Sequence, residues 1–229
     1  MDVQASGLRT SLYSVSSDGG KGGDIYYFTV CSHDALSRIV VADVVGHGAA
    51  INTISKWLYD ALVAQRESLD GNTVLTDLNC TVNEHGFDAL TTAAVVTFYV
   101  NNSNLYFSYA GHPPLLMRRR NEITWRAVNL QPSVRPTHLP LGVLPNTTYQ
   151  QEHVPLAAGD RLFLYTDGVI EAPDSDDGLF GETRLIEALE RTGDKDLNEV
   201  KHEVLAAVRA HTGDSLVHDD LTMLVIEVN

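Results

Sequence analysis

The sequence predicts an α+β protein, an α/β/β/α sandwich in which two antiparallel sheets pack face to face and a pair of helices covers each outer face. Strand-like segments cluster in hairpins instead of alternating one for one with helices, which favours antiparallel sheets. Segments with helical spacing form two pairs, one in each half of the chain. The 229 residues, 44% of them hydrophobic, suffice for a single core. No linker or repeat divides the chain, so we expect one domain over residues 1–229, with residues 1–17 as a loose segment or a first strand.

The strand-like segments are rich in β-branched and aromatic residues. They span residues 25–30, 38–44, 90–100, 104–110, 115–119 and 123–127. Polar turn residues separate neighbouring segments, so the first two form a predicted hairpin and the last four a predicted antiparallel meander. Residues 160–166, nearly all apolar, predict a buried strand, and residues 221–228 predict a terminal strand.

Apolar residues recur at helical spacing in four segments. These are residues 51–65 and 74–82, separated by Asp70-Gly71-Asn72, and then 185–189 and 197–208. Between the two pairs, residues 129–149 hold four of the eight prolines and predict an irregular loop. The four helices therefore fall into one pair on each side of the central strands.

The charge balance excludes several classes of partner. The chain carries 30 Asp and Glu residues against 16 Lys and Arg residues, a formal net charge of −14. Such a surface repels nucleic acid and anionic lipid. No apolar run approaches the roughly 20 residues that cross a bilayer. With only two cysteines, Cys31 and Cys80, and no signal-like start, we expect a cytoplasmic protein. Composition leaves the oligomeric state open.

Carboxylates stand at the ends of predicted strands, beside glycine or a second Asp. They are Asp24, Asp43, Asp167 and the pair Asp219-Asp220. A carboxylate buried at such a position needs a counter-charge, and no matching set of Lys or Arg lies beside these strands. Divalent cations would supply it. Oxygen ligands without thiolates favour Mg²⁺ or Mn²⁺ over zinc, and two such ions would form a hydrolytic centre.

Six short motifs follow one another along the chain. They are Gly22-Gly23-Asp24-Ile25-Tyr26, Asp43-Val44-Val45-Gly46-His47-Gly48, Tyr109-Ala110-Gly111-His112-Pro113-Pro114, Pro140-Leu141-Gly142-Val143, the stretch from Gly159 to Ala172, and Asp219-Asp220-Leu221-Thr222. In this order of motifs, from about Ser17 to its last residue, the chain resembles the SpoIIE/RsbU/RsbX-type phosphatases, the bacterial branch of the PPM metal-dependent serine/threonine phosphatases. This resemblance implies the same sandwich fold, with two Mn²⁺ or Mg²⁺ ions at one end.

The resemblance also implies a role for each site residue. Asp24 corresponds to a ligand of one ion, Asp43 to the bridging ligand, Val44 to a backbone-carbonyl ligand, and Asp167 and Asp219 to ligands on the other side. Asp220 is the alternative to Asp219. A water bridging the ions would attack phosphorus in line. His47 either protonates the leaving serine or threonine oxygen or fixes its own loop by a hydrogen bond.

The substrate implied by the resemblance is a phosphorylated bacterial regulatory protein, with a STAS-domain anti-sigma-factor antagonist as the expected partner. A catalytically inactive binding or scaffold module of the same fold is the alternative. Tyr27 stands where many family members carry a further Asp, which puts an additional metal contact in doubt. The helical lead-in of many members is absent, so we expect either a short stand-alone member or a catalytic domain of a longer protein.

Other motifs receive structural interpretations. His112, between Gly111 and two prolines, is interpreted as a turn residue, and the run Arg118-Arg119-Arg120 as a solvated stretch of strand. A haloacid-dehalogenase loop at Asp167 is excluded because Tyr165 occupies the nucleophile position. An EF-hand loop starting at Asp174 is excluded because Leu185 stands at its twelfth position, where Glu is required.

Overall fold

The structure is a computed structural model that describes residues 1–17, 22–30, 34–46, 49–85, 90–134, 136–216 and 218–229. Three residues named above, Cys31, His47 and Gly48, lie outside these ranges.

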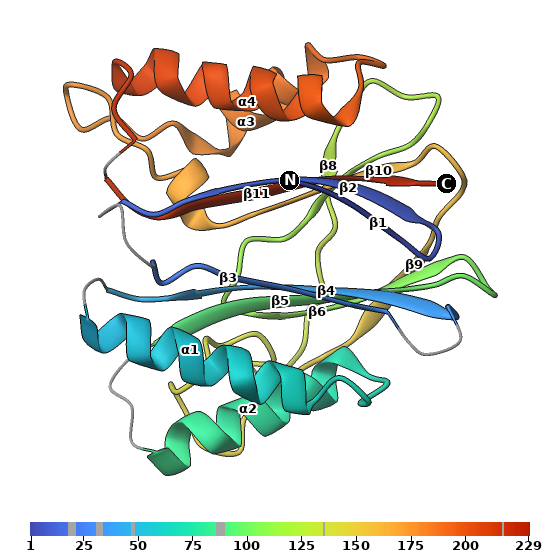
Figure 1. Ribbon diagram of the computed structural model, residues 1–229, viewed down its shortest axis with the longest axis vertical. Helices are drawn as coiled ribbons and strands as arrows, with labels where there is room; N and C mark the ends of the chain where they lie inside the picture. The colour runs from blue at the N-terminus through green and yellow to red at the C-terminus, as the bar shows by residue number, and fades with distance from the viewer. Residues whose placement is uncertain (18–21, 31–33, 47–48, 86–89, 135, 217) are drawn as a thin grey trace.

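Two antiparallel sheets form the centre of the molecule (Figure 1). The six-stranded sheet has the order β1 (Asp2–Ala5), β2 (Leu8–Val15), β11 (Leu221–Val228), β10 (Arg161–Tyr165), β7 (Leu116–Arg118), β8 (Arg126–Ala127). The five-stranded sheet has the order β3 (Ile25–Val30), β4 (Leu36–Val44), β5 (Thr91–Tyr99), β6 (Asn104–Ala110), β9 (Glu152–Pro155). Within the described ranges, every named strand pair is antiparallel, as predicted.

One pair of helices covers each outer face. Helices α1 (Ala49–Ala64) and α2 (Gly71–His85) lie against the five-stranded sheet, and α3 (Gly181–Glu190) and α4 (Leu197–Thr212) lie against the six-stranded sheet (Figure 1). A short 3₁₀ turn, η1 (Asp167–Val169), follows β10. The predicted α/β/β/α sandwich is therefore confirmed.

The apolar side chains form three layers of core. Because successive residues of a strand point to opposite faces, each sheet can bury both faces at once. One layer lies between the sheets, one under α3 and α4, and one under α1 and α2. Representative residues of these layers are Val41, Val96 and Leu224 for the first, Phe163, Leu189 and Met223 for the second, and Val40, Leu75 and Val95 for the third.

Helix α4 shows how local sequence sets an element's ends. Asp196 caps its N-terminus by accepting from the backbone of Glu199 at 2.9 Å, and the Glu199 side chain accepts from the Asp196 backbone at 3.0 Å, which completes a capping box. Gly213, with φ +63°, ends the helix in the left-handed conformation. None of the helices in the described part of the chain has the length and apolar character needed to cross a membrane.

Two sequence expectations need correction or sharpening. The predicted four-stranded meander over residues 90–127 is wrong, because β5 and β6 belong to the five-stranded sheet and β7 and β8 to the six-stranded sheet. The chain crosses between the sheets at Gly111, whose φ of +66° breaks the strand before two prolines. At the N-terminus, the structure forms two strands, and β2 pairs with β11 along its whole length.

Candidate metal centre

The acidic motifs meet at one end of the sandwich. Asp43 stands near the end of β4 and Asp24 directly before the adjacent β3, while Asp167 follows β10 and Asp219 precedes the adjacent β11. Antiparallel pairing brings the end of one strand beside the start of its neighbour. A hydrogen bond from Thr166 Oγ1 to Asp24 Oδ2, 2.9 Å long, joins the two sheets at this end. We call the group Asp24, Asp43, Asp167, Asp219 and Asp220 the acidic cluster.

Asp24 carries a buried oxygen without a partner. Its Oδ2 accepts from Thr166, but no protein group among the described residues donates to its buried Oδ1. Burial raises the pKa of Asp24 to about 7, the hydrogen bond from Thr166 opposes the rise, and the charges of Asp220 and Asp167 add to it. An unpaired, buried carboxylate oxygen is a suitable ligand atom for a cation.

Asp43 lies at the electrostatic centre of the acidic cluster. Burial raises its pKa to about 8, and the four other carboxylates of the cluster each contribute to the rise. The pKa of Asp167 is also raised, first by burial and then by the charges of Glu171 and Asp219. Within the described ranges, no Lys or Arg forms an ion pair with any member of the cluster. The cluster therefore lacks a counter-charge from the protein.

The backbone at Val44 is brought close to the Gly22-Gly23 turn. The Val44 N–H donates to the Gly23 carbonyl at 3.3 Å, and a Cβ added to Gly23 would lie 2.5 Å from the Val44 carbonyl oxygen. Only glycine permits this approach. The Val44 carbonyl thus lies between Asp43 and the turn that carries Asp24, while the Val44 side chain is buried in the core.

The adjacent residues Asp219 and Asp220 differ in environment. The buried Asp220 carboxylate accepts from the Ser17 N–H at 2.9 Å, the Ser17 hydroxyl at 3.2 Å and the Asp24 N–H at 3.4 Å, and also from the Gly23 N–H. Asp219 is exposed and accepts from the Asp220 N–H at 2.8 Å. These contacts favour Asp219 as the cation ligand and give Asp220 the role of holding the turn before β3.

Several neighbours of the acidic cluster were not singled out from the sequence. Thr166 accepts from the Thr222 N–H at 3.0 Å and donates to Asp24, and the His218 ring nitrogen lies 2.8 Å from the Gly168 carbonyl oxygen. A Cβ on Gly168 would lie 1.9 Å from the Asp220 carbonyl oxygen. The only signal for these roles was that Thr166, Gly168 and Thr222 stand inside the acidic motifs.

The residues of the cluster fit hard divalent cations in their chemistry, because they offer oxygen atoms, an unpaired buried acceptor and uncompensated negative charge. As they stand, however, no three His, Cys, Asp or Glu side chains in the described part of the chain are grouped closely enough to hold an ion. The assignment of Asp24, Asp43, Val44, Asp167 and Asp219 as ligands stays a prediction.

Four further sequence expectations concern residues that are not members of the acidic cluster. His47 lies outside the described residues. The Tyr27 ring packs edge-on against Tyr59 of α1, 5.7 Å between centroids, so it serves packing. His112 is buried in its turn, with Nδ1 3.2 Å from the Pro113 carbonyl oxygen. The expectation that the run at residues 118–120 is solvated is wrong for Arg118, which is buried and paired with Asp194 at 3.1 Å.

Comparisons with known proteins identify similar sequences and similar folds. The family model described as "Stage II sporulation protein E (SpoIIE)" matches residues 33–229. Protein IcfG of Synechocystis is 26% identical over 90% of this chain and 36% of its own length. The phosphoserine phosphatase RsbP of Bacillus subtilis is 23% identical over 95% of this chain and 51% of its own length. The chain thus spans about half or less of these curated relatives.

Solved structures share the fold. The RsbU and RsbW domains of a Mycobacterium tuberculosis protein superpose with a TM-score of 0.82 at 22% identity, over 98% of this chain and 61% of that one. RsbX, solved in complex with magnesium, superposes with a TM-score of 0.71 at 16% identity, over 100% of this chain and 99% of that one.

Proposed function

This chain belongs to the SpoIIE family of PPM-type phosphatases, and from that premise we propose that it hydrolyses phosphoserine or phosphothreonine on a bacterial regulatory protein in a metal-dependent reaction. The observation that carries the proposal is the acidic cluster, in which five carboxylates from two sheets meet without any counter-charge from a Lys or Arg of the described residues. A structural role alone does not account for the cost of gathering them.

The chain's own groups would hold two divalent cations, Mn²⁺ or Mg²⁺. Asp24, Asp43, Asp167, Asp219 and the Val44 carbonyl are the proposed ligands, and Asp220 holds the turn that carries Asp24. When bound, the cations supply an activated water for attack on phosphorus and neutralise the phosphoryl oxygens. His47, four residues after Asp43, is the proposed proton donor to the leaving oxygen.

Exposed apolar side chains beside the acidic cluster support a protein as the substrate. Val45 is 54% exposed and Leu144 is 52% exposed. Leu144 belongs to the loop whose Leu141 bridges to Thr91, and Thr91 pairs with Val44, the residue before Val45. We take the surface that carries these two residues as the proposed docking surface for the partner. A STAS-domain partner in the cytoplasm is the proposed substrate, on the family resemblance.

The proposal is tested by measuring phosphate release from a phosphoserine peptide with Mn²⁺ and with EDTA. We expect turnover only with Mn²⁺, and a loss of at least 10²-fold in Asp43→Ala. The matched control Asp60→Ala alters an exposed carboxylate of α1 that is paired with Lys56, and it should retain activity. Absence of metal-stimulated turnover in the folded protein would favour the inactive scaffold instead.

Recognition of a protein substrate is tested separately at Leu144. The variant Asp167→Asn, used as a substrate trap, should remain bound to a phosphorylated regulatory protein. That protein then serves as the substrate in the kinetic assays. We expect Leu144→Ser to raise KM for the partner several-fold and to leave p-nitrophenyl phosphate hydrolysis unchanged. Leu179→Ser, which alters a residue of similar exposure in the loop before α3, is the control. Equal effects of both variants would argue against docking at Leu144.

A further inference from the structure

A second charged region lies at the end of the sandwich opposite the acidic cluster. Asp167 follows the last residue of β10, whereas Arg161 is its first residue, so the two lie at opposite ends of that strand (Figure 1). Around Arg161 the surface is hollowed by a cavity of 510 Å³, lined by Arg118, Arg120, Arg161, Asp194 and Glu227 among others. We call it the arginine hollow.

The arginines of the hollow belong to a row of charges across the six-stranded sheet. The register places Arg161 of β10 directly opposite Arg118 of β7 on one side and Glu227 of β11 on the other, and it places Glu227 opposite Arg9 of β2. Directly opposed residues share one face of a sheet. Glu227 accepts from Arg161 Nε at 2.8 Å and also pairs with Arg9. Between Arg161 and Arg118, however, no carboxylate intervenes in the row.

Two like charges are therefore buried next to each other. The side chain of Arg118 is 4% exposed and that of Arg161 is 8% exposed. Opposed like charges destabilise a sheet, and burial strengthens their repulsion. Each of the two has one carboxylate partner, Glu227 for Arg161 and Asp194 for Arg118.

The hydrogen bonding of Arg118 is incomplete. Both of its terminal nitrogens bind the same Asp194 oxygen, at 3.1 and 3.2 Å, and Nη1 also donates to the Glu122 carbonyl at 3.2 Å. Its Nε is buried and has no partner among the described residues. The carboxylate of Asp194 is 88% exposed, so the one counter-ion that the described residues give this buried guanidinium is a solvated one.

Arg120 supplies a further donor. Its backbone N–H is fixed by Asp160 Oδ1 at 3.0 Å, and its aliphatic chain lies against Gly159, where an added Cβ would be 2.8 Å from Arg120 Cδ. The guanidinium itself has no hydrogen bond or ion pair to any described residue. Three arginines, Arg118, Arg120 and Arg161, thus line the hollow beside Asp194, Glu227 and the last residue, Asn229, whose terminal carboxylate is a third acid. The groups that lack an acceptor among the described residues are the Arg118 Nε and the Arg120 guanidinium.

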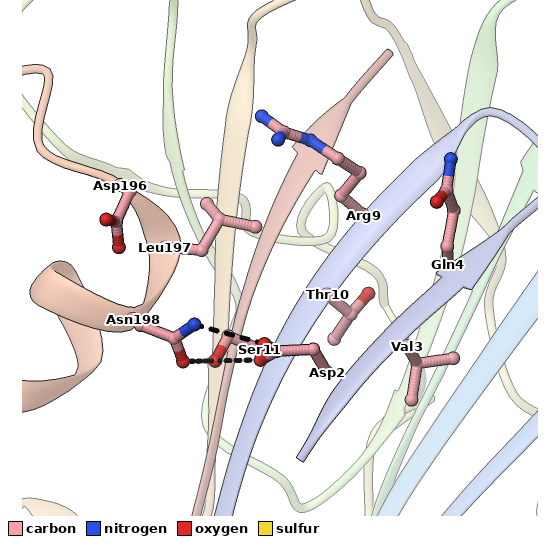
Figure 2. Close-up of a pocket in the computed structure, with 9 residues that line it drawn as sticks. All are labelled: Asp2, Val3, Gln4, Arg9, Thr10, Ser11, Asp196, Leu197 and Asn198. Atoms are coloured by element: carbon pink, nitrogen blue, oxygen red, sulfur yellow. Dashed lines mark hydrogen bonds between the residues drawn. The ribbon is translucent and has the colours of Figure 1, made fainter.

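In another hollow of the protein the polar side chains are paired with one another. It has a volume of 350 Å³ and lies between β1, β2 and the start of α4 (Figure 2). There Ser11 Oγ lies 3.0 Å from Asp2 Oδ1 and 2.7 Å from Asn198 Oδ1, and Asn198 donates to Asp2 at 3.1 Å. The Lys201 ammonium donates to Ser11 and Asn198, and Asp196 caps α4. Its polar groups satisfy each other, in contrast to those of the arginine hollow.

We propose that the arginine hollow binds a small phosphate-bearing molecule. The planar donors of guanidinium groups match phosphate oxygens, which would accept from the Arg118 Nε and the Arg120 guanidinium. The volume lies in the range of small-ligand sites. A nucleic acid is excluded by the net charge of −14, which repels a polyanion. This site is separate from the acidic cluster, and its occupancy does not require divalent cations.

The test is a titration of inorganic phosphate in EDTA at constant ionic strength, followed by the ¹H–¹⁵N signals of the arginine Nε groups. We expect a saturable shift of the Arg118 Nε–H signal. Arg120→Gln should weaken phosphate binding by roughly tenfold, through loss of one charged donor. Arg66→Gln, which removes the same charge from an exposed arginine paired with Glu67, should leave the affinity unchanged.

A parallel titration with glycerol 3-phosphate distinguishes the source of the phosphate group. Tighter binding than inorganic phosphate identifies a phosphate ester as the ligand, and equal binding identifies free phosphate; both support the site. Absence of saturation with both probes would overturn the proposal. So would an equal loss of affinity in Arg120→Gln and Arg66→Gln, because the effect would then come from net charge alone.

Discussion

Asp219 and Asp220 are neighbours in the chain, yet their environments differ. Asp219 is exposed, whereas Asp220 is buried and its carboxylate accepts hydrogen bonds from backbone N–H groups of the segment before β3. We expect Asp220→Asn to lower the free energy of unfolding in EDTA by about 1–3 kcal/mol, because its amide would face backbone donors. Asp219→Asn should leave this stability unchanged but reduce stabilisation by Mn²⁺. Urea unfolding with and without Mn²⁺ measures both, and the reverse pattern would make Asp220 the ligand.

His112 links stability to pH. Burial lowers its pKa to about 4, while the unfolded chain titrates near 6.5. Between these values the unfolded state binds more protons, so the contribution of His112 to stability is fully present above pH 6.5 and is lost as the pH falls towards 4. The buried carboxylates whose pKa is raised change the stability with pH in the opposite direction. The effect of His112 is therefore isolated by comparing the wild-type protein with a variant that lacks this histidine.

We therefore expect the stability difference between the wild-type protein and His112→Asn to shift against the wild type by about 3 kcal/mol between pH 6.5 and pH 4. Urea unfolding of both proteins at several pH values measures it. A difference that stays constant with pH would mean that His112 is not held neutral by burial.

At the scale of elements, the turn η1 depends on a close approach of two strand ends. A Cβ on Gly168 would lie 1.9 Å from the Asp220 carbonyl oxygen. Gly168→Ala must therefore push apart two backbone segments, the one that carries Asp167 and the one that carries Asp219 and Asp220. We expect a loss of about 1–3 kcal/mol in stability together with weaker Mn²⁺ binding. Gly193→Ala is the control, since nothing lies within 4 Å of its added Cβ and only its φ of +52° opposes alanine.

Thermal melting and Mn²⁺ titration compare the two glycine variants. Gly193→Ala should cost about 1 kcal/mol, from the positive φ alone, and should bind Mn²⁺ like the wild type. Unchanged Mn²⁺ binding in Gly168→Ala would show that the close approach of β10 and β11 does not position the ligands.

Element prediction succeeded where a segment's own pattern decides its structure. The terminal strand and the four helices were predicted because their apolar spacing is regular. Strand β2 was harder, because two adjacent polar residues, Thr10 and Ser11, are buried and interrupt the apolar alternation; Ser11 accepts from Lys201. Strand β9 was missed, since it is a four-residue edge strand ending in Pro155. Pairing with distant strands, not local pattern, forms these two elements.

At the scale of the molecule, the charge of −14 is unevenly distributed between the two ends of the sandwich. Five carboxylates gather at one end, and three arginines line a hollow at the other. Without cations the acidic end is destabilised by mutual repulsion. Any ion that binds only the folded state adds RT ln(1 + [L]/Kd) to its stability.

We therefore expect Mn²⁺ at about 100 times its Kd to raise Tm by roughly 5–10 °C, equivalent to about 2.7 kcal/mol. In EDTA, Asp43→Asn should melt at a higher temperature than the wild type, because it removes the carboxylate that the four others repel. Its Tm should also rise less on addition of Mn²⁺. Differential scanning calorimetry measures both effects. A wild-type Tm indifferent to Mn²⁺ and EDTA would contradict the metal centre.

The sequence by itself determined the types of the elements, the sandwich class and the positions of the acidic motifs, because periodicity and strand-end glycines are local properties. Only the tertiary structure decided which sheet β7 joins, that Asp220 holds the turn before β3, and that Arg118 is buried opposite Arg161. The physical reason is that hydrogen bonds and burial between residues far apart in the chain depend on how the two sheets pack, which no local pattern encodes.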